Sequence, residues 1–329
     1  MPGADWSDPV DHLLALDPGG RGIAAFFTPG AALAAATALR HASRVLITTG
    51  FAVAEGAGET DGPPGAAVVG RALRLLGARV AFVTDPVTVP LLEAALKVLG
   101  EPVDITVYPV GRNAAADVLD RQRPTHLIAI ERPGRAASGD YLSARAESVA
   151  AWNRPLDDLF IGSGARGPGV SGVTRSRPGS ARRRGSRSGP VTVGVGDGGN
   201  EIGMGNVRPR LVRARSPLAR IASVVRTDHL VVAGTSNWGA YGIVVQLARL
   251  CGRPLLHSPD LERRMVEACV QAGAVDGITR RREATVDGLA LSVHAAVVAL
   301  LGLASSSELR GLAPASGMIG VTRGRKASR

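Results

Sequence analysis

The sequence predicts an α/β fold, with a mainly parallel β-sheet, helices on both faces and an acidic cleft at the carboxyl ends of the strands. Two observations lead to this fold class. Short, continuous apolar runs alternate with amphipathic segments of helical periodicity, which is the pattern of buried parallel strands joined by helices. Glycines and acidic or amide residues end or follow these runs, at the edge where open α/β sheets bind ligands.

Five apolar runs are predicted to be strands, because each is short, continuous and bounded by polar or glycine residues. They are "RVLITTG" (44–50), "ARVAFVTD" (78–85), "THLIAIE" (125–131), "PVTVGVGD" (190–197) and "DHLVVAG" (228–234). Acidic or amide side chains stand at or just after the end of each run. A single acidic strand end is commonplace, whereas a series of them indicates a site.

Helices are predicted between these strands. The segments 65–77, 87–100 and 241–252 have amphipathic patterns, and Gly77 ends the first of them. A shorter helix is predicted at "PLDDLF" (155–160). Hydrophobic residues make up 45% of the 329 residues and aromatic residues only 3%, so we expect a sizeable core built from Ala, Val and Leu.

The chain is expected to divide into a helical lead-in (1–40), one α/β domain (41–305) and a flexible C-terminal tail (306–329). Residues 162–190 are low-complexity Gly, Ser, Arg and Pro with almost nothing apolar to bury, so this segment is predicted to be a disordered insertion in the domain. Much of the net charge of +11 comes from residues 163–196, which contain seven arginines and no acid. No nucleic-acid motif accompanies them, so no specific nucleic-acid partner is expected, and polyanion binding stays an alternative.

The glycine loop "VTVGVGDGGNEIGMGNV" (191–207) is the most informative segment. Gly194, Gly196 and Gly199 match the dinucleotide pattern G-x-G-x-x-G after a strand. Asp197 and Glu201 weaken that interpretation, because carboxylates repel a pyrophosphate. We therefore expect no nucleotide cofactor. Instead, Asp197 and Glu201 are predicted to hold a divalent cation, Mg²⁺ or Mn²⁺, or to orient a substrate amine.

Two further loops carry candidate site residues. In "GAGETDGPPG" (56–65), Glu59 and Asp61 could face one cavity as metal ligands, and the alternative is a helix cap. In "ERPGR" (131–135), Glu131 ends a strand, and Arg132 and Arg135 could bind a substrate carboxylate or form a surface ion pair.

The segment "RTDHLVVAGTSNWGAYG" (226–242) adds polar residues at both ends of the last strand. His229 could act as a base near neutral pH, although a histidine beside a strand is more often structural. Ser236 and Asn237 follow the carboxyl end of the strand and are predicted substrate contacts.

Other classes of protein are disfavoured by the residues that are present. The sequence has no P-loop, zincin or nucleophile-elbow motif. Cys251 and Cys269 have no CxxC partner, which favours buried thiols. The first 20 residues lack a signal-peptide pattern, and no run reaches the ~20 apolar residues of a membrane span, so a cytoplasmic protein without membrane contact is expected.

Taken together, the motifs resemble the D-glutamate cyclase family. The resemblance rests on segments in order over residues 40–295, among them "GAGETDGPPGAA" (56–67), "ERPGRAASGDY" (131–141), "VGVGDGGNEIGMGNV" (193–207), "TDHLVVAGTSNWGAYG" (227–242) and "TVDG" (285–288). It implies a lyase that converts D-glutamate reversibly to 5-oxo-D-proline and water, in an acidic, metal-accepting cavity. It also implies the stand-alone bacterial form, which lacks the hydro-lyase-like region of animal members.

The chemistry of ring closure suggests a role for each candidate. Asp197 and Glu201, with Glu59 or Asp61, would hold a Lewis-acidic cation, and Glu131 would act as the base. Arg132 or Arg135 would anchor the α-carboxylate, and the backbone N–H groups of Gly198 and Gly199 would stabilise the tetrahedral oxyanion. Asn200, Ser236 and Asn237 would contact the rest of the substrate. The alternatives are another metal-dependent hydrolase or lyase on this scaffold and a nucleotide- or polyanion-binding protein. The partner expected is a small amino acid, and a homo-oligomer is left open.

Overall fold

The computed structural model describes residues 7–162 and 189–305. The predicted tail at 306–329 lies outside the described residues. So does the predicted insertion, apart from Gly162, which ends a helix, and residues 189–190, which precede a strand.

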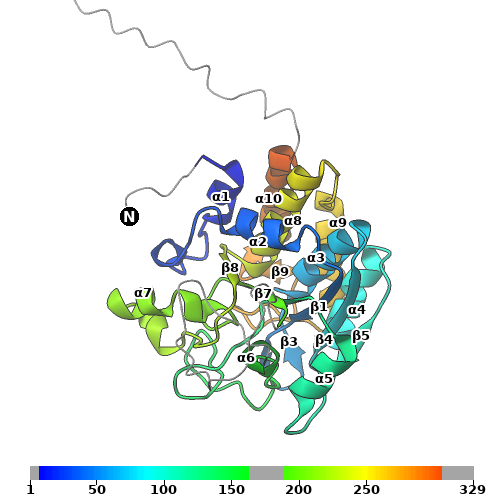
Figure 1. Ribbon diagram of the computed structural model, residues 1–329. Helices are drawn as coiled ribbons and strands as arrows, with labels where there is room; N and C mark the ends of the chain where they lie inside the picture. Colours follow the sequence, from blue (N-terminus) through cyan, green and yellow to red (C-terminus); the bar gives the residue numbers. More distant parts are fainter. Residues whose placement is uncertain (1–6, 163–188, 306–329) are drawn as a thin grey trace, which may run out of the picture.

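The centre of the molecule is a six-stranded parallel sheet with the order β5-β4-β1-β6-β7-β8 (Figure 1). The strands are β1 (Arg44–Thr49), β4 (Arg79–Thr84), β5 (Ile105–Val107), β6 (His126–Ile130), β7 (Val191–Gly196) and β8 (His229–Val232). The five predicted strands are confirmed. The additional strand β5 is short and lies at the edge of the sheet, where its residues are intermediate or exposed.

The strand order explains where the site forms. From β1 the chain moves outward to β4 and β5, and it then returns to the other side of β1 for β6, β7 and β8. The connection that leaves β1 and the connection that leaves β6 therefore run in opposite directions along the sheet. At this point Thr49, the last residue of β1, pairs with Ile130, the last residue of β6. Open α/β sheets bind ligands outside the carboxyl ends of the strands at such a switch point. Gly50 and Glu131 lie there.

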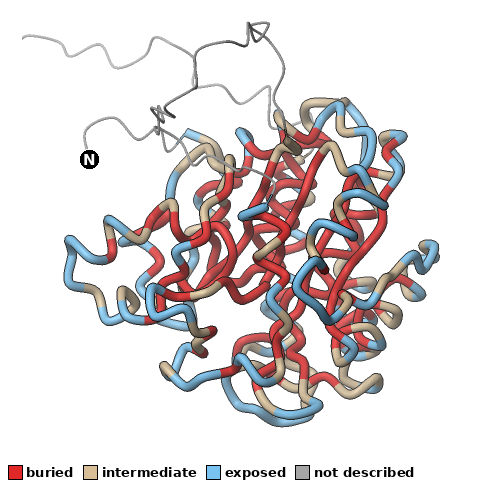
Figure 2. Tube along the Cα trace, turned by 60° about the horizontal axis from the view of Figure 1, so that its bottom comes forward, coloured by how far each residue is buried: buried red, intermediate tan, exposed pale blue. Residues whose placement is uncertain are grey.

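Helices cover both faces of the sheet, and alternate residues of each strand contact different layers. Ile47 belongs to the larger core, which includes α2, α3, α4, α8, α9 and α10, whereas Leu46 belongs to a smaller core with α5 and α6. Figure 2 shows the buried residues concentrated in the central strands and the helices that face them. The helices are α2 (Ala31–Leu39), α3 (Pro63–Leu75), α4 (Val89–Val98), α5 (Ala114–Gln122), α6 (Asp158–Gly162), α8 (Ser236–Cys251), α9 (Pro259–Gln271) and α10 (Leu291–Ser305).

The N-terminal segment packs on this domain. Val10 and Leu14 of α1 (Pro9–Leu14) and Ala35 and Leu39 of α2 lie in the larger core, and α2 packs against α8 and β8. The loop between α1 and α2 contains the short 3₁₀ helix η1 (Ile23–Ala25). It lies beside the carboxyl ends of β7 and β8, because the Gly234 N–H donates to the Leu14 carbonyl and Arg21 pairs with Asp197. Residues from this region can therefore reach the site.

Small elements complete the fold. Two hairpins, β2 (Ala52–Ala54) with β3 (Ala57–Gly58) and β9 (Thr285–Val286) with β10 (Leu289–Ala290), lie outside the main sheet. The segment after β7 contains η2 (Met204–Asn206), α7 (Arg208–Arg213) and η3 (Pro217–Arg220). Among the described residues, none of the helices combines the length and the apolar composition that crossing a membrane requires.

Candidate active site

Six carboxylate side chains gather at the carboxyl edge of the sheet, and all six are buried. They come from loops after β1, β6 and β7 and from the β9–β10 hairpin. We call them the carboxylate cluster: Glu59, Asp61, Glu131, Asp197, Glu201 and Asp287. Five of these residues were predicted from the sequence, and the loops in which they lie do converge.

Carboxylate oxygens within the cluster lie close enough to share a cation. Those of Asp61, Asp197 and Asp287 lie within 4.8 Å of one another, and so do those of Glu131, Asp197 and Glu201. Asp197 belongs to both groups and so links them. Glu59 is in neither group, although it lines the same cavity.

Local backbone geometry directs these side chains inward. Glu131 follows β6 directly and has a left-handed φ of 42°. Non-glycine residues rarely adopt this conformation, and where they do the surrounding structure holds it. The hydroxyl of Ser236 donates a 2.5 Å hydrogen bond to Glu131 Oε2, which fixes the carboxylate at the switch point.

The N-terminus of α8 faces the cluster. The Ser236 N–H lies 2.8 Å from Asp61 Oδ2 and 3.0 Å from Asp197 Oδ2, and the Asn237 N–H donates to Asp61 Oδ1 at 2.8 Å. The first N–H groups of a helix lack intrahelical partners and carry partial positive charge, so they stabilise these carboxylates. The helix was predicted to begin at 241. It begins at Ser236 because Thr235 caps it, accepting a hydrogen bond from the Trp238 N–H.

The side chain of Asn237 holds the opposite loop. Its Oδ1 accepts from the N–H groups of Gly62 and Gly65 at 3.1 and 2.8 Å. The predicted substrate contacts Ser236 and Asn237 thus both bind protein groups in the cluster. Their predicted contact with a substrate stays a prediction.

The glycine loop positions Glu201 rather than a phosphate. Glu201 Oε1 accepts from the N–H groups of Asp197 and Gly198, at 2.9 and 2.5 Å. Because the Gly198 N–H already has this partner, its predicted role as an oxyanion donor gains no support, whereas Gly199, with a φ of 92°, turns the chain. Asn200 lines the cavity and donates to the carbonyl of Leu142 at 2.7 Å.

The two arginines predicted to bind a substrate carboxylate have other partners. Arg132 is fully buried and donates to Asp85 and to the carbonyl oxygens of Gly50 and Arg154. Arg135 is held by Asp157 and Asp158. These ion pairs tie the loop after β6 to the loops around it, and they give no support to the predicted role in substrate binding.

Sequence reasoning missed two residues of the site. Arg21, in the loop before η1, forms ion pairs with Asp197 and with Asp287. Asp287 occupies the turn between β9 and β10, where it and Gly288 have positive φ angles of 56° and 76°. Asp-Gly is a favoured pair for such two-residue hairpin turns, so "TVDG" contained a signal for the turn but none for its place in the fold.

His229 is far from the cluster along its strand. It is the first residue of β8, at the amino edge of the sheet, beside Asp228, which accepts from the N–H and hydroxyl of Thr192 at 2.9 Å. The hypothesis that His229 is the catalytic base is therefore wrong for this site.

Burial raises the pKa values of four of these carboxyl groups, those of Glu59, Asp61, Glu131 and Asp197. Burial raises the pKa of Asp61 to about 7, and the charge of Asp287 adds to this effect. Burial also raises the pKa of Glu131 well above its ordinary value, with further contributions from the charges of Glu201 and Glu59. The pKa of Asp197 is raised by burial as well, although Arg21 opposes the shift. Such carboxyl groups can exchange protons near neutral pH.

The residues present fit a hard divalent cation. Glu59 Oε1, Glu201 Oε2 and Asp287 Oδ2 are buried and have no hydrogen-bond partner. Buried charged oxygens without partners are costly, and carboxylate oxygens are the preferred ligands of Mg²⁺ and Mn²⁺. The carboxylate cluster is therefore compatible with metal binding.

A cavity of about 150 Å³ opens onto the cluster. Its lining includes four buried carboxylates and Arg21, which pairs with two of them, and also the exposed Arg145 and Arg280 from two loops at the mouth: the carboxylates are Glu59, Glu131, Asp197 and Asp287. These loops hold each other, since Arg145 donates to the Ile278 carbonyl at 2.9 Å and Arg280 pairs with Glu147 at 2.6 Å. The cavity thus has an acidic interior and a basic mouth.

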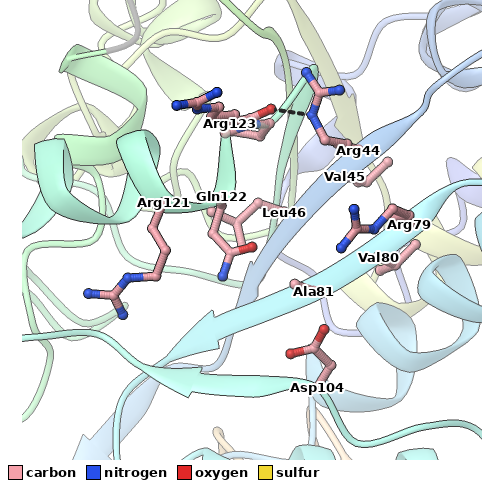
Figure 3. Close-up of a pocket in the computed structure, with 11 residues that line it drawn as sticks. Arg44, Val45, Leu46, Arg79, Val80, Ala81, Asp104, Arg121, Gln122 and Arg123 are labelled. Carbon is pink, nitrogen blue, oxygen red and sulfur yellow. Dashed lines mark hydrogen bonds between the residues drawn. The ribbon is translucent and has the colours of Figure 1, made fainter.

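A larger cavity of about 450 Å³ lies at the opposite edge of the sheet, at the amino ends of β1 and β4 (Figure 3). Its lining contains Asp104 as the single carboxylate and none of the predicted site residues. Four of its lining residues are arginines: Arg44, Arg79, Arg121 and Arg123. We call it the arginine hollow. Because it has a single carboxylate and none of the predicted site residues, it is not the candidate active site.

Comparisons with known proteins identify relatives of this chain. A family model described as D-glutamate cyclase-like, C-terminal, matches residues 10–175 and 180–302. The chain is 36% identical over 254 residues to the mitochondrial D-glutamate cyclase of Homo sapiens. The aligned region covers 72% of this chain and 38% of the human protein. The chain therefore spans well under half the length of that relative.

A solved structure, the exonuclease RecJ bound to manganese, matches 73% of this chain and 42% of its own, with a TM-score of 0.34 and 10% identity. That likeness is too low to carry an argument. The family match, by contrast, covers most of the chain and both loops that supply Asp197 and Glu131. The chain belongs to the D-glutamate cyclase-like, C-terminal family.

Proposed function

We propose that this chain is a D-glutamate cyclase-like lyase, which converts D-glutamate reversibly to 5-oxo-D-proline and water. The observation that carries the proposal is a small cavity with a carboxylate interior and an arginine mouth. Such a cavity is complementary to an amino acid that has an ammonium group and two carboxylates. The family membership supports the reaction, and the preference for the D form rests on the family alone.

Ring closure requires a balanced movement of protons. The α-nitrogen forms a bond to the γ-carboxyl carbon, and one C–O bond of the γ-carboxyl group breaks. The ammonium loses two protons, and the departing oxygen gains two and leaves as water. Glu131, whose pKa is raised by burial and by the charge of Glu201, is proposed to accept a proton from nitrogen and return it to oxygen.

The remaining carboxylates are proposed to hold a divalent cation, Mg²⁺ or Mn²⁺. Asp197 would be the central ligand, with Asp61, Glu201 and Glu59 as the predicted ligands and Asp287 as the one that the structure adds. When bound, such a cation would supply Lewis acidity toward the γ-carboxylate. The α-carboxylate is proposed to bind at the mouth, to Arg145 or Arg280, in place of Arg132 or Arg135, whose guanidinium groups already have partners.

The test is turnover of D- and L-glutamate, with and without a chelator, followed by chiral detection of 5-oxoproline. We expect 5-oxo-D-proline from D-glutamate, and loss of activity in Asp197→Asn. Asp104→Asn, in the arginine hollow, is the matched carboxylate control and should leave turnover unchanged. Absence of 5-oxoproline from an intact, metal-supplied protein would refute the reaction and favour another metal-dependent hydrolase or lyase. A cytoplasmic location stays a prediction, and the oligomeric state stays open.

A further inference from the structure

Arg21 occupies an unusual position for a loop residue. Its Nη1 contacts Asp197 Oδ1 and its Nη2 contacts Asp287 Oδ1, so one guanidinium bridges two members of the carboxylate cluster. Both carboxylates are buried, and the Arg21 side chain is itself only 17% exposed. Within residues 7–162 and 189–305, Arg21 is the only cationic side chain that forms an ion pair with the cluster.

One guanidinium does not balance the cluster. It supplies a single positive charge to six carboxylates, and it leaves Glu59 Oε1, Glu201 Oε2 and Asp287 Oδ2 without partners. A divalent cation would supply twice the charge at the same place. Its ligands would include Asp61, Asp197 and Asp287, and Arg21 now contacts the last two. The guanidinium and the cation therefore compete for the same carboxylates.

The loop that carries Arg21 can move without disturbing the core. Arg21 lies between Gly20 and Gly22, which have left-handed φ angles of 65° and 73° and open space beside them. Asp17 holds the loop by accepting from the N–H groups of Arg21, Gly22 and Ile23, at 2.8, 2.7 and 3.2 Å. The contacts of Asp17 with Arg21 and Gly22 are local, whereas Ile23 is the first residue of η1 and is buried in the larger core, so the proposed shift is confined to residues 17–22.

We propose that Arg21 is a resident counter-ion, which bridges Asp197 and Asp287 in the cation-free protein and leaves them when a divalent cation binds. Arg21 is thus a positioning residue, since it keeps the two ligands close together until the cation arrives. The inference rests on the cation binding of the proposed function, and it does not depend on which substrate is used.

The test is Mn²⁺ binding to the full chain, measured by electron paramagnetic resonance and calorimetry. Arg21→Gln removes the competing charge, and we expect it to bind Mn²⁺ about tenfold more tightly or better, as for loss of a charged hydrogen-bonding partner. The matched control is Arg145→Gln, which removes an exposed arginine at the same cavity that does not contact the cluster. Its affinity should change by less than about threefold, since exposed charges are screened.

Displacement of the loop has a separate readout. In the wild-type protein, Mn²⁺ should increase hydrogen–deuterium exchange at residues 17–22, before η1. In Arg21→Gln, exchange there should be high already and change little. If Arg21→Gln does not fold, Arg21→Lys keeps one positive charge but cannot bridge both carboxylates, and it should also bind Mn²⁺ more tightly than wild type.

Equal Mn²⁺ affinity in wild type and Arg21→Gln would overturn the proposal, and so would tighter binding without a change in exchange in the wild-type loop. If neither protein binds Mn²⁺, the cation part of the proposed function fails together with this inference. Turnover of D-glutamate, assayed on the same samples, separates the cases. Tighter Mn²⁺ binding without turnover would support the inference and refute the reaction.

Discussion

Two regions of this molecule bury glutamate almost equally, with opposite results. Glu131 is 6% exposed and Glu262, on α9, is fully buried. Glu262 accepts from Tyr241 Oη at 2.7 Å and lies 2.8 Å from His257 Nε2. Burial alone would raise its pKa, but these partners outweigh burial and lower it. Burial raises the pKa of Glu131, and the neighbouring carboxylates add to this increase.

The difference shows that partners, rather than burial, separate a structural carboxylate from a reactive one. A buried acid with a histidine and a tyrosine stays ionised and ties helices together. A buried acid among other acids is held near the point of proton exchange, at a cost to stability. Buried ion pairs such as Arg132–Asp85 belong to the first kind, although they lie next to the site.

The largest expected effect is on activity. Glu131→Gln keeps the shape and the hydrogen bond from Ser236 but removes the proton acceptor. We expect turnover to fall by about 10³-fold, within the range for loss of a general base. Thermal unfolding should occur at a higher temperature than in wild type, because one like charge is gone. Retained turnover, or a large loss of stability, would place Glu131 with the structural carboxylates.

The second effect is on stability. Glu262→Gln removes the charge that His257 and Tyr241 stabilise, and we expect the free energy of unfolding to fall by about 3 kcal/mol, as for a broken buried pair. Turnover per folded molecule should stay within about twofold. Urea denaturation measures the first quantity. Glu267→Gln, at an exposed position on the same helix, is the control and should have little effect. A stable Glu262→Gln protein would contradict the comparison.

The third effect is a change of stability with pH. The pKa of Asp61 rises from 3.8 in the unfolded chain to about 7 on folding, so between these values the native state binds more protons than the unfolded state. This contribution to stability is therefore present at low pH and lost as pH rises toward 7, by at most about 1.4 kcal/mol per pH unit.

Asp61→Asn removes this contribution. With a chelator present, the stability of wild type minus that of Asp61→Asn should fall as pH increases from about 4 to 7, as followed by urea denaturation at each pH. A difference that rises with pH would mean that Asp61 is paired in the native state, as Glu262 is.

The sheet was predictable because its strands are buried on both faces and are therefore continuous apolar runs. β5 was not, because Ile105–Val107 is only three residues long and its pattern gives no hydrophobic run. The sequence predicted the start of α8 at residue 241 instead of Ser236, because Ser236 and Asn237 are polar residues typical of a loop. Their burial depends on the loop at Asp61, which is 175 residues away in the chain from Ser236.

The candidate site was predictable where acidic residues follow strands directly, as Glu131 and Asp197 do. Arg21 was not, because it comes from a segment without a strand and meets Asp197 across 176 positions. The partners of Arg132 and Arg135 could not be predicted from the sequence for a related reason. A guanidinium beside a site is equally suited to substrate or to Asp157, and only packing decides between them.

The turn of the β9–β10 hairpin, which supplies Asp287 to the site, can be replaced by other turns. Asp287 sits on a two-residue turn whose strands pair only with each other, and the adjoining Val286 carbonyl is held by His294 of α10 at 3.2 Å. The turn's chemistry can therefore vary while the sheet and its neighbours stay as they are. Grafting turns of different charge or length at this corner would give a series of cavities with graded electrostatics on an unchanged frame.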